Sequence, residues 1–292
     1  MKIRIISDLH IDLNCQYPLS LRNKNIFTII AGDISGHPEY SKKWIDANIK
    51  NGLFIAGNHI VYNNKSKTLP EWKEYLKEQY PLNNNVSFLE NQYKEIDGKI
   101  FIGCTLYTDY EFSKDIESSK MVAEKRMNDF RYGTIKENNK KRNLTPDDYL
   151  KWHKESLKFI KKIVKENENK DIIIITHHCP AAECILEKYR DNPTLNSSYV
   201  SSLENYIKKH NNIKCWICGH VHNRKHFKVG NCLIIQNPRG YESYGESYSW
   251  TPNFILDTDT WEITEKPYTN KEWEKQRKLD DLKWKVFEGL VF

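Results

Sequence analysis

The sequence predicts an α/β domain in which strands and helices alternate and the ends of several strands share one cleft. Amphipathic helical patterns cover residues 40–50 and 69–80, and they separate the early apolar runs. A helix between successive strands is the pattern of a mostly parallel sheet. Short apolar runs rich in isoleucine have the length of buried strands; they span residues 2–7, 26–31, 53–56, 171–176 and 214–218.

Each of these runs ends in a polar motif. Loops that follow the carboxyl ends of parallel strands meet at one edge of a sheet, even when they are distant in sequence. Five separate segments can therefore contribute to one site. The motifs are Asp8-Leu9-His10, Gly32-Asp33, Gly57-Asn58-His59, His177-His178 and Gly219-His220-Val221-His222.

The remaining segments divide the chain into a body, an insertion and an extension. Residues 227–236 and 253–263 have the pattern of antiparallel hairpins, so we expect the body to span 1–265. From about 107 to 170 the chain is rich in Lys, Glu and Asn with helical spacing, which predicts a helical cap inserted into the body. Residues 266–292 are expected to form a C-terminal helix packed on the body.

Composition excludes several classes of protein. With 292 residues and 39% hydrophobic side chains the chain can build a sizeable core, whereas its apolar runs are far too short to cross a bilayer. The N-terminal apolar stretch contains a charge, unlike a signal peptide, and the seven cysteines are scattered and odd in number. We therefore expect a cytoplasmic protein with free thiols and no membrane partner. A net charge of +6 is compatible with phosphate-bearing substrates but does not select them.

Cys215 and Cys218 have the spacing of a redox pair or of half a zinc site. They lie on an apolar strand that leads into the last histidine motif, where small buried thiols are common. No second pair of cysteines stands at zinc-ribbon spacing. We therefore interpret both as core residues.

The first three motifs contain residue types that bind metal ions. Asp8 and His10 are two apart, so on an extended backbone their side chains leave the same side and can bind one cation. Asp33 follows a glycine that permits a sharp turn, and its two oxygens can bridge two cations. Asn58 offers a carbonyl oxygen, whereas His59 beside it is suited to act as an acid. Taken singly, these residues are explained as well or better as turns, caps or surface residues.

The two histidine motifs are more specific. His177 and His178 follow four isoleucines, and buried imidazoles are costly unless each finds a partner, although one of them can be structural. His220 and His222 alternate after a glycine at a strand end, so they can divide between two neighbouring cations. Five motifs in one order, each at the end of a strand, favour a shared metal centre over five unrelated turns.

Together the motifs resemble the calcineurin-like metallophosphoesterase family. The resemblance rests on Ser7-Asp8-Leu9-His10, Gly32-Asp33, Gly57-Asn58-His59, His177 and Gly219-His220-Val221-His222. It implies a four-layer fold, a sandwich of two β-sheets flanked by helices, with a dinuclear metal centre at the sheet edge. It also implies the ligands of the two ions: Asp8, His10, Asp33 and His222 for one, and Asp33, Asn58, His177 and His220 for the other. The family pattern continues Gly-Asn-His with an acidic residue, whereas this chain has Ile60.

The resemblance further implies a phosphoesterase that hydrolyses a phosphomonoester or a phosphodiester. Two divalent or trivalent ions would activate a bridging hydroxide for direct attack on phosphorus; manganese is the first expectation, and iron, zinc and cobalt also suit the ligands. His59 would protonate the leaving group. His178 and Arg131 are candidates for contacts with the phosphate-ester substrate.

Two alternative functions remain open from the sequence. Nucleases share these motifs, but the lysines at 158–165 are interleaved with few aromatic residues, so a platform that stacks bases is not evident and nucleic acid is not the favoured substrate. A non-catalytic interaction module on the same fold is the second alternative, and the intact ligand set argues against it. No His-x-His-x-Asp-His run is present, which disfavours the two-metal hydrolases of the metallo-β-lactamase type.

Overall fold

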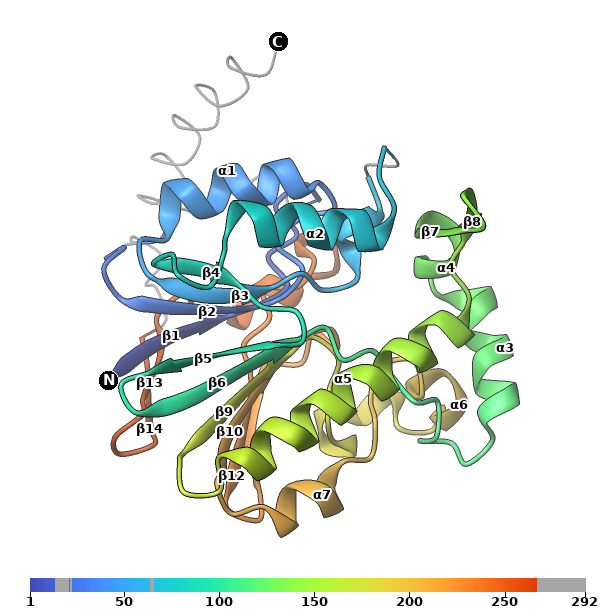
Figure 1. The fold of residues 1–292 in the computed structure, drawn as a ribbon. Coiled ribbons are helices and arrows are strands. Elements are labelled where there is room, and N and C mark those ends of the chain that lie inside the picture. The colour runs from blue at the N-terminus through green and yellow to red at the C-terminus, as the bar shows by residue number, and fades with distance from the viewer. Residues whose placement is uncertain (14–20, 22, 64–65, 267–292) are drawn as a thin grey trace.

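Two six-stranded β-sheets face each other in the computed structural model, and helices cover the outer face of each sheet (Figure 1). The structure describes residues 1–13, 21, 23–63 and 66–266. The predicted α/β class and the two-sheet sandwich are confirmed. The helices of the outer layers are α1 (Pro38–Asn48) and α2 (Leu69–Gln79) on one side, and α5 (Pro146–Glu166) and α7 (Glu204–Lys209) on the other.

The first sheet contains β1 (Lys2–Ile6), β2 (Phe27–Ala31), β3 (Gly52–Ile55), β4 (Val86–Phe88), β13 (Phe254–Asp257) and β14 (Glu262–Glu265). Its order is β14-β13-β1-β2-β3-β4, and β1 to β4 are parallel. β13 and β14 form the predicted antiparallel hairpin, which pairs with β1. The carboxyl ends of β1, β2 and β3 therefore lie at one edge.

The second sheet contains β5 (Gln92–Ile96), β6 (Lys99–Cys104), β9 (Ile172–Thr176), β10 (Ile213–Cys218), β11 (Lys225–Val229) and β12 (Cys232–Gln236). Its order is β11-β12-β10-β9-β6-β5. β6, β9, β10 and β12 run parallel, and β11 and β12 form the second predicted hairpin. β9 and β10 thus bring their carboxyl ends together.

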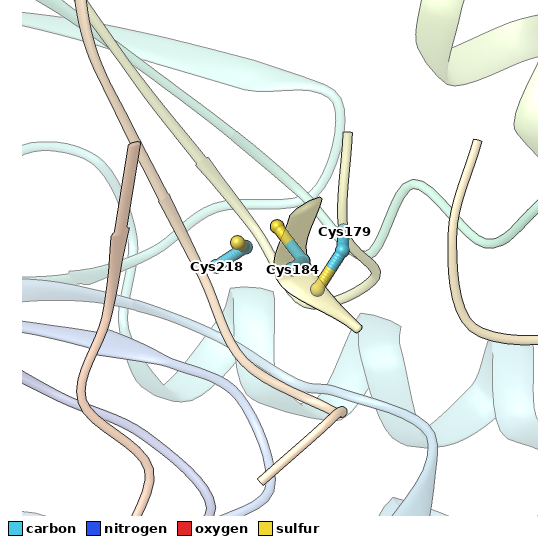
Figure 2. A group of neighbouring side chains, drawn as sticks. All are labelled: Cys179, Cys184 and Cys218. Carbon is cyan, nitrogen blue, oxygen red and sulfur yellow. The ribbon is translucent and has the colours of Figure 1, made fainter. Parts of the chain in front are cut away.

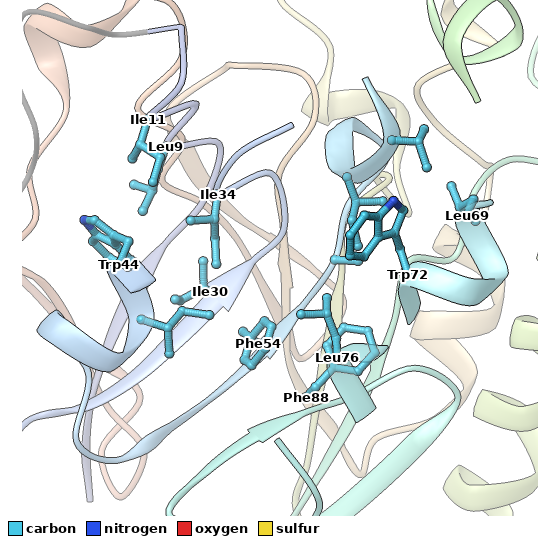
Figure 3. Close-up of a cluster of buried hydrophobic side chains, with 14 of the residues drawn as sticks. Leu9, Ile11, Ile30, Ile34, Trp44, Phe54, Leu69, Trp72, Leu76 and Phe88 are labelled. Atoms are coloured by element: carbon cyan, nitrogen blue, oxygen red, sulfur yellow. The ribbon is translucent and has the colours of Figure 1, made fainter. Parts of the chain in front are cut away.

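Alternation along the strands explains the layers. Ile3 and Ile5 of β1 point between the sheets, where they pack with Ile173 and Ile175 of β9, and all four are fully buried. Each such side chain contributes about 1.5–3 kcal/mol through burial. The opposite face of the first sheet packs against α1 and α2; Figure 3 shows this cluster, which includes Phe54, Phe88, Trp44, Trp72 and Leu76.

The segment from about 107 to 170 contains helices and a short β-hairpin. It comprises α3 (Ile116–Arg126), α4 (Asp129–Tyr132), the antiparallel strands β7 (Thr134–Glu137) and β8 (Lys140–Asn143), and the start of α5. These elements project beyond the sheets on one side of the molecule (Figure 1). The last turns of α5 instead cover the second sheet, because Ile160, Ile163 and Val164 pack against its strands.

A second segment, which the sequence did not single out, completes the cap. It holds the 3₁₀ turns η2 (Ala182–Cys184) and η3 (Glu187–Tyr189) and the short helix α6 (Pro193–Asn196), which contacts α3. The predicted C-terminal helix lies outside the described residues, apart from Lys266. Within residues 1–13, 21, 23–63 and 66–266, no helix is long and apolar enough to span a membrane.

Candidate metal centre

The motif residues meet where strands of both sheets end. Asp8 and His10 follow β1, Asp33 follows β2, and His220 and His222 follow β10. All five have positive φ angles, between 43° and 68°, a region that residues other than glycine rarely adopt. Such backbone conformations persist where the surroundings impose them, and they cluster at functional sites.

The motif glycines are required by close packing. A Cβ atom on Gly57 would lie 2.1 Å from Asp33 Oδ1, and one on Gly219 would lie 2.5 Å from Asp8 Oδ2. Gly32 and Gly57 also have φ angles of 91° and 79°, and residues with a Cβ atom rarely adopt such angles. The glycines thus leave room for the carboxylates.

One group of ligand atoms consists of Asp8, His10 and His222. The Nε2 atoms of His10 and His222 are 3.0 Å apart, and His222 Nε2 is 3.4 Å from Asp8 Oδ1. His222 Nδ1 donates to Glu246 Oε2 at 2.8 Å, so its Nε2 is free to bind a metal as a neutral imidazole. Two nitrogens bound at right angles to one cation, each at about 2.1 Å, would have this 3.0 Å separation.

The second group brings Asn58 and His177 to Asp33 and His220. His177 Nδ1 donates to the carbonyl oxygen of Ala31 at 2.9 Å, which leaves Nε2 without a proton in the neutral ring. That nitrogen lies 2.8 Å from Asn58 Oδ1 and 3.1 Å from Asp33 Oδ2. Three acceptors this close repel one another unless a proton or a cation lies between them, so the donor set fits a metal ion.

Unpartnered polar atoms support the same interpretation. Asp8 Oδ2 and His220 Nε2 are buried and have no hydrogen-bond partner among the described residues. Leaving such atoms unpaired costs about 1–3 kcal/mol each. A cation coordinated by them would remove that cost.

Electrostatics at the two groups favour added positive charge. Burial lowers the pKa of His177, but the carboxylate of Asp33 outweighs burial and raises the pKa to about 9. Burial likewise lowers the pKa of His222, and hydrogen bonds to Asp8 and Glu246 raise it to about 10. The carboxylates thus favour a positive charge on His177 and His222, and a bound cation could supply that charge in place of the proton.

The other two histidines of these groups, His10 and His220, favour the neutral form. Burial and the neighbouring His59 hold the pKa of His10 well below its usual range. Burial and His178 do the same for the pKa of His220. Neutral imidazoles are the form that binds metal ions.

His59 lies beside the ligand groups at the surface of a cavity. Its backbone N–H donates to Asp33 Oδ1 at 3.0 Å, and its Nε2 is 3.2 Å from the Tyr241 hydroxyl. The ring stacks on Tyr62 with 4.0 Å between centroids. These contacts fix the imidazole while one side faces the cavity.

The cavity has a volume of about 370 Å³ and lies between the metal centre and the cap. Its floor includes Asp33, Asn58, His220 and His222. The cap contributes Arg126, Met127 and Asn128 from the α3–α4 turn, and Leu186, Tyr189, Asn192, Leu195, Asn196 and Tyr199 from the second segment. The cap side of the lining therefore combines apolar and aromatic side chains with three asparagines and one guanidinium.

The structure does not bring two predicted substrate contacts to this cavity. Arg131 is exposed, and its guanidinium lies over the Tyr132 ring; Arg126, one helix earlier, lines the cavity instead. His178 is buried beneath His220, with 4.1 Å between ring centroids, because the extended strand turns its side chain to the opposite face from His177. His178 therefore packs under the centre.

Four residues near the centre were missed from the sequence. Glu246 and Tyr241 follow β12, whose carboxyl end lies at the same edge because β12 is parallel to β10. Tyr62 and Asp129 form a chain of hydrogen bonds to Asn58. Glu246 and Tyr241 could have been found only by predicting that β12 pairs in parallel with β10. The hairpin predicted for residues 227–236 does not reveal that pairing.

Three comparisons place the chain among known proteins. The family model for calcineurin-like phosphoesterases matches residues 1–224. An uncharacterised protein of Acanthamoeba polyphaga mimivirus is 29% identical over 278 residues, which cover 88% of this chain and 96% of the viral one. The structure of phosphopantetheinyl hydrolase from Mycobacterium tuberculosis gives a TM-score of 0.63 at 15% identity, over 85% of this chain and 92% of that one. A putative 5′-nucleotidase from Staphylococcus aureus gives 0.46 at 15% identity, over 96% and 58%.

The sandwich, with carboxylates and histidines gathered at its strand ends, defines a metal-dependent phosphoric ester hydrolase. Since the family model covers well over half of the 292 residues, the chain belongs to the calcineurin-like phosphoesterase family. At 15% identity, the hydrolase structure supports the fold alone.

Proposed function

We propose that this phosphoesterase uses two metal ions to hydrolyse the phosphate ester of a small organic molecule. One observation carries the proposal: Asp33 belongs to two groups of neighbouring ligand atoms, one with His10 and His59 and one with His177 and His220. A carboxylate in that position can bridge two cations.

Each ion would have its own ligands. Asp8, His10 and His222 would hold the first ion and Asn58, His177 and His220 the second, with Asp33 shared. Two bound cations would supply an activated water and neutralise the charge of the phosphoryl oxygens. Mixed oxygen and nitrogen ligands suit manganese, which we propose as the first metal to test, and also iron, zinc and cobalt.

His59 is positioned to protonate the leaving group. Its ring is held between Tyr62 and the Tyr241 hydroxyl, and it lines the cavity where a substrate would bind. General acid catalysis of this kind contributes about 100-fold to 10,000-fold to the rate. No serine or cysteine nucleophile is required, so we expect no covalent phosphoenzyme.

The cavity supports a small substrate over a nucleic acid. Its volume of about 370 Å³ lies in the range of sites for small molecules. Arg126 is the single arginine or lysine among the described residues that line it, whereas a nucleic-acid groove needs several cations along the backbone. Tyr189, Tyr199 and Leu186 would contact the organic part of the ester.

The test is hydrolysis of an aryl phosphomonoester and of the matching diester by manganese-loaded protein. We expect activity that Asp33→Asn abolishes and that Asp115→Asn retains, because Asp115 caps α3 at an exposed position. The ratio of the two rates selects phosphatase or phosphodiesterase. Binding of fewer than two ions per chain would contradict the mechanism, and inactivity on every ester despite two bound ions would favour the interaction module.

A further inference from the structure

Three cysteines converge behind the metal centre. Cys179 follows His177 by two residues, and Cys218 ends β10 two residues before His220. Cys184 belongs to η2 of the cap. All three are fully buried, and their sulfur atoms lie within 4.8 Å of one another. Figure 2 shows the three side chains side by side, from three different segments.

The surroundings of the sulfurs are polar on one side. Each thiol lies within hydrogen-bonding reach of the other two. Cys179 Sγ donates to the carbonyl oxygen of Gly219 at 3.2 Å and accepts from Gln236 Nε2 at 3.5 Å. Gln236 is itself fully buried, and its Oε1 has no hydrogen-bond partner among the described residues.

The three cysteines belong to the apolar core cluster on the outer face of the second sheet, but apolar packing alone does not require them to meet. Single buried cysteines behave as small apolar residues, as Cys104, Cys215 and Cys232 do, and within the described part of the chain none of these joins a group of three ligand atoms. Packing gives no reason for three thiols to meet, nor for an amide with an unpaired oxygen beside them. Buried polar atoms of this kind call for a ligand.

We propose that Cys179, Cys184 and Cys218 bind one Zn²⁺ ion as thiolates, separately from the carboxylate and histidine centre. Zinc at about 2.3 Å from each sulfur places tetrahedral sulfurs about 3.8 Å apart, which agrees with the observed limit of 4.8 Å. Gln236, whose amide already contacts Cys179 Sγ, would supply a fourth ligand through its oxygen once the amide turns toward the ion. Thiolates select a softer ion than the mixed oxygen and nitrogen ligands of the nearby centre.

The zinc ion would join three parts of the site. It connects the loop of His177, the loop of His220 and the second cap segment through one residue from each. Cys179 and Cys184 are five residues apart, and Cys218 follows 34 residues later, so the ion would fix the start of the second cap segment relative to the ends of β9 and β10. The inference stands independently of the proposed phosphoesterase mechanism, because none of its ligands belongs to that mechanism.

X-ray absorption at the zinc edge tests the site directly. Protein produced with zinc in the medium, and kept reduced during purification, is measured as wild type, Cys184→Ser and Cys232→Ser. The carboxylate and histidine centre contains no sulfur, so only the proposed site gives zinc–sulfur scattering near about 2.3 Å. We expect this signal in the wild type and in Cys232→Ser, where the buried thiol lies outside the cluster.

Cys184→Ser should lose the sulfur signal and one zinc ion per chain. Circular dichroism of the variant checks that the fold is retained, and Cys218→Ser provides a second variant if it is not. Zinc bound only through nitrogen and oxygen in the wild type overturns the proposal, whatever the variants do. Sulfur scattering that persists in Cys184→Ser would overturn the assignment of these ligands.

Discussion

The hydrogen bonds that orient Asn58 make a specific prediction for Asp129→Asn. Asp129 is fully buried in the cap, where its Oδ2 accepts from the Tyr62 hydroxyl at 2.9 Å and its Oδ1 from the Tyr149 hydroxyl at 2.6 Å. Burial and the carboxylate of Asp129 raise the pKa of Tyr62 well above its usual value, so the hydroxyl keeps its proton. Because a carboxylate only accepts, Tyr62 must donate to it.

That direction fixes the amide of Asn58. The Tyr62 oxygen, having donated its proton to Asp129, accepts from Asn58 Nδ2 at 3.2 Å. The other end of the amide, Oδ1, then faces His177, where we propose the second ion. An amide can be turned by half a turn at little cost, so the acceptor at 129 is what selects oxygen as the ligand.

Asparagine at 129 keeps the shape but replaces one acceptor with an N–H donor. If that donor faces Tyr62, the hydroxyl must donate to Asn58, and the Asn58 amide turns its nitrogen toward the metal site. Residues that orient a ligand contribute about 10-fold to 100-fold in metal affinity, or about 1.4–2.7 kcal/mol. That range agrees with about 1.5–3 kcal/mol for a hydrogen bond to a charged group.

Manganese titration by calorimetry measures the effect. We expect one of two binding events to weaken by this factor and the other to stay unchanged, with Tyr62→Phe producing the same loss and the double variant adding little. Asp115→Asn is the control, since asparagine caps a helix as well as aspartate does. Wild-type affinity at both sites in Asp129→Asn and Tyr62→Phe would refute the reasoning.

Three further predictions concern the ligands and the cavity. Glu246→Ala removes the acceptor of His222 Nδ1 and should weaken the first ion about 10-fold to 100-fold, measured by chelator competition. Arg126→Ala should raise KM about twofold to fivefold, whereas Arg131→Ala, outside the cavity, should leave KM unchanged. In metal-free protein, His177 and His222 have pKa values raised above the unfolded value of about 6.5. Their stabilisation is complete below that pH and is lost as pH rises through about 9 and 10, so Tm should fall over this interval. Added manganese should reduce the fall, and a Tm independent of alkaline pH would contradict the assignment.

Residues whose partners follow from local pattern were predictable from the sequence. The positions of Asp8, Asp33 and His220 followed from the motifs at the ends of the apolar strands. Parallel pairing places the carboxyl ends of these strands at one edge of a sheet. His178 and Arg131 could not be placed in this way. Which face a loop residue presents depends on backbone turns that the tertiary structure imposes, and Arg126 and Arg131 are separated by one such turn at residues 127–128.

The cap could not be folded from its pattern because its decisive contacts are long-range. Asp129 meets Tyr62 across 67 residues, and α3 meets α6 from the second segment. Charged helical sequence around α3 gives little indication of the face that it buries. The hydrogen-bonding chain that passes through Tyr62 to Asn58 therefore had no local signature.

This chain departs from its family pattern at Ile60, and the carboxylate that reaches Asn58 through Tyr62 is that of Asp129. The position after Gly-Asn-His is apolar here, and Ile60 is buried in the core cluster under α2, so it offers no acceptor to the neighbouring polar groups. Asp129 supplies a buried carboxylate one tyrosine away from Asn58. A carboxylate carried by the cap, rather than by the strand-end loop, would make the amide orientation at the proposed metal centre depend on the docking of α4. Changes that displace α4 should therefore alter metal affinity as well as access to the cavity. If the cap only covered the site, such changes would alter access alone.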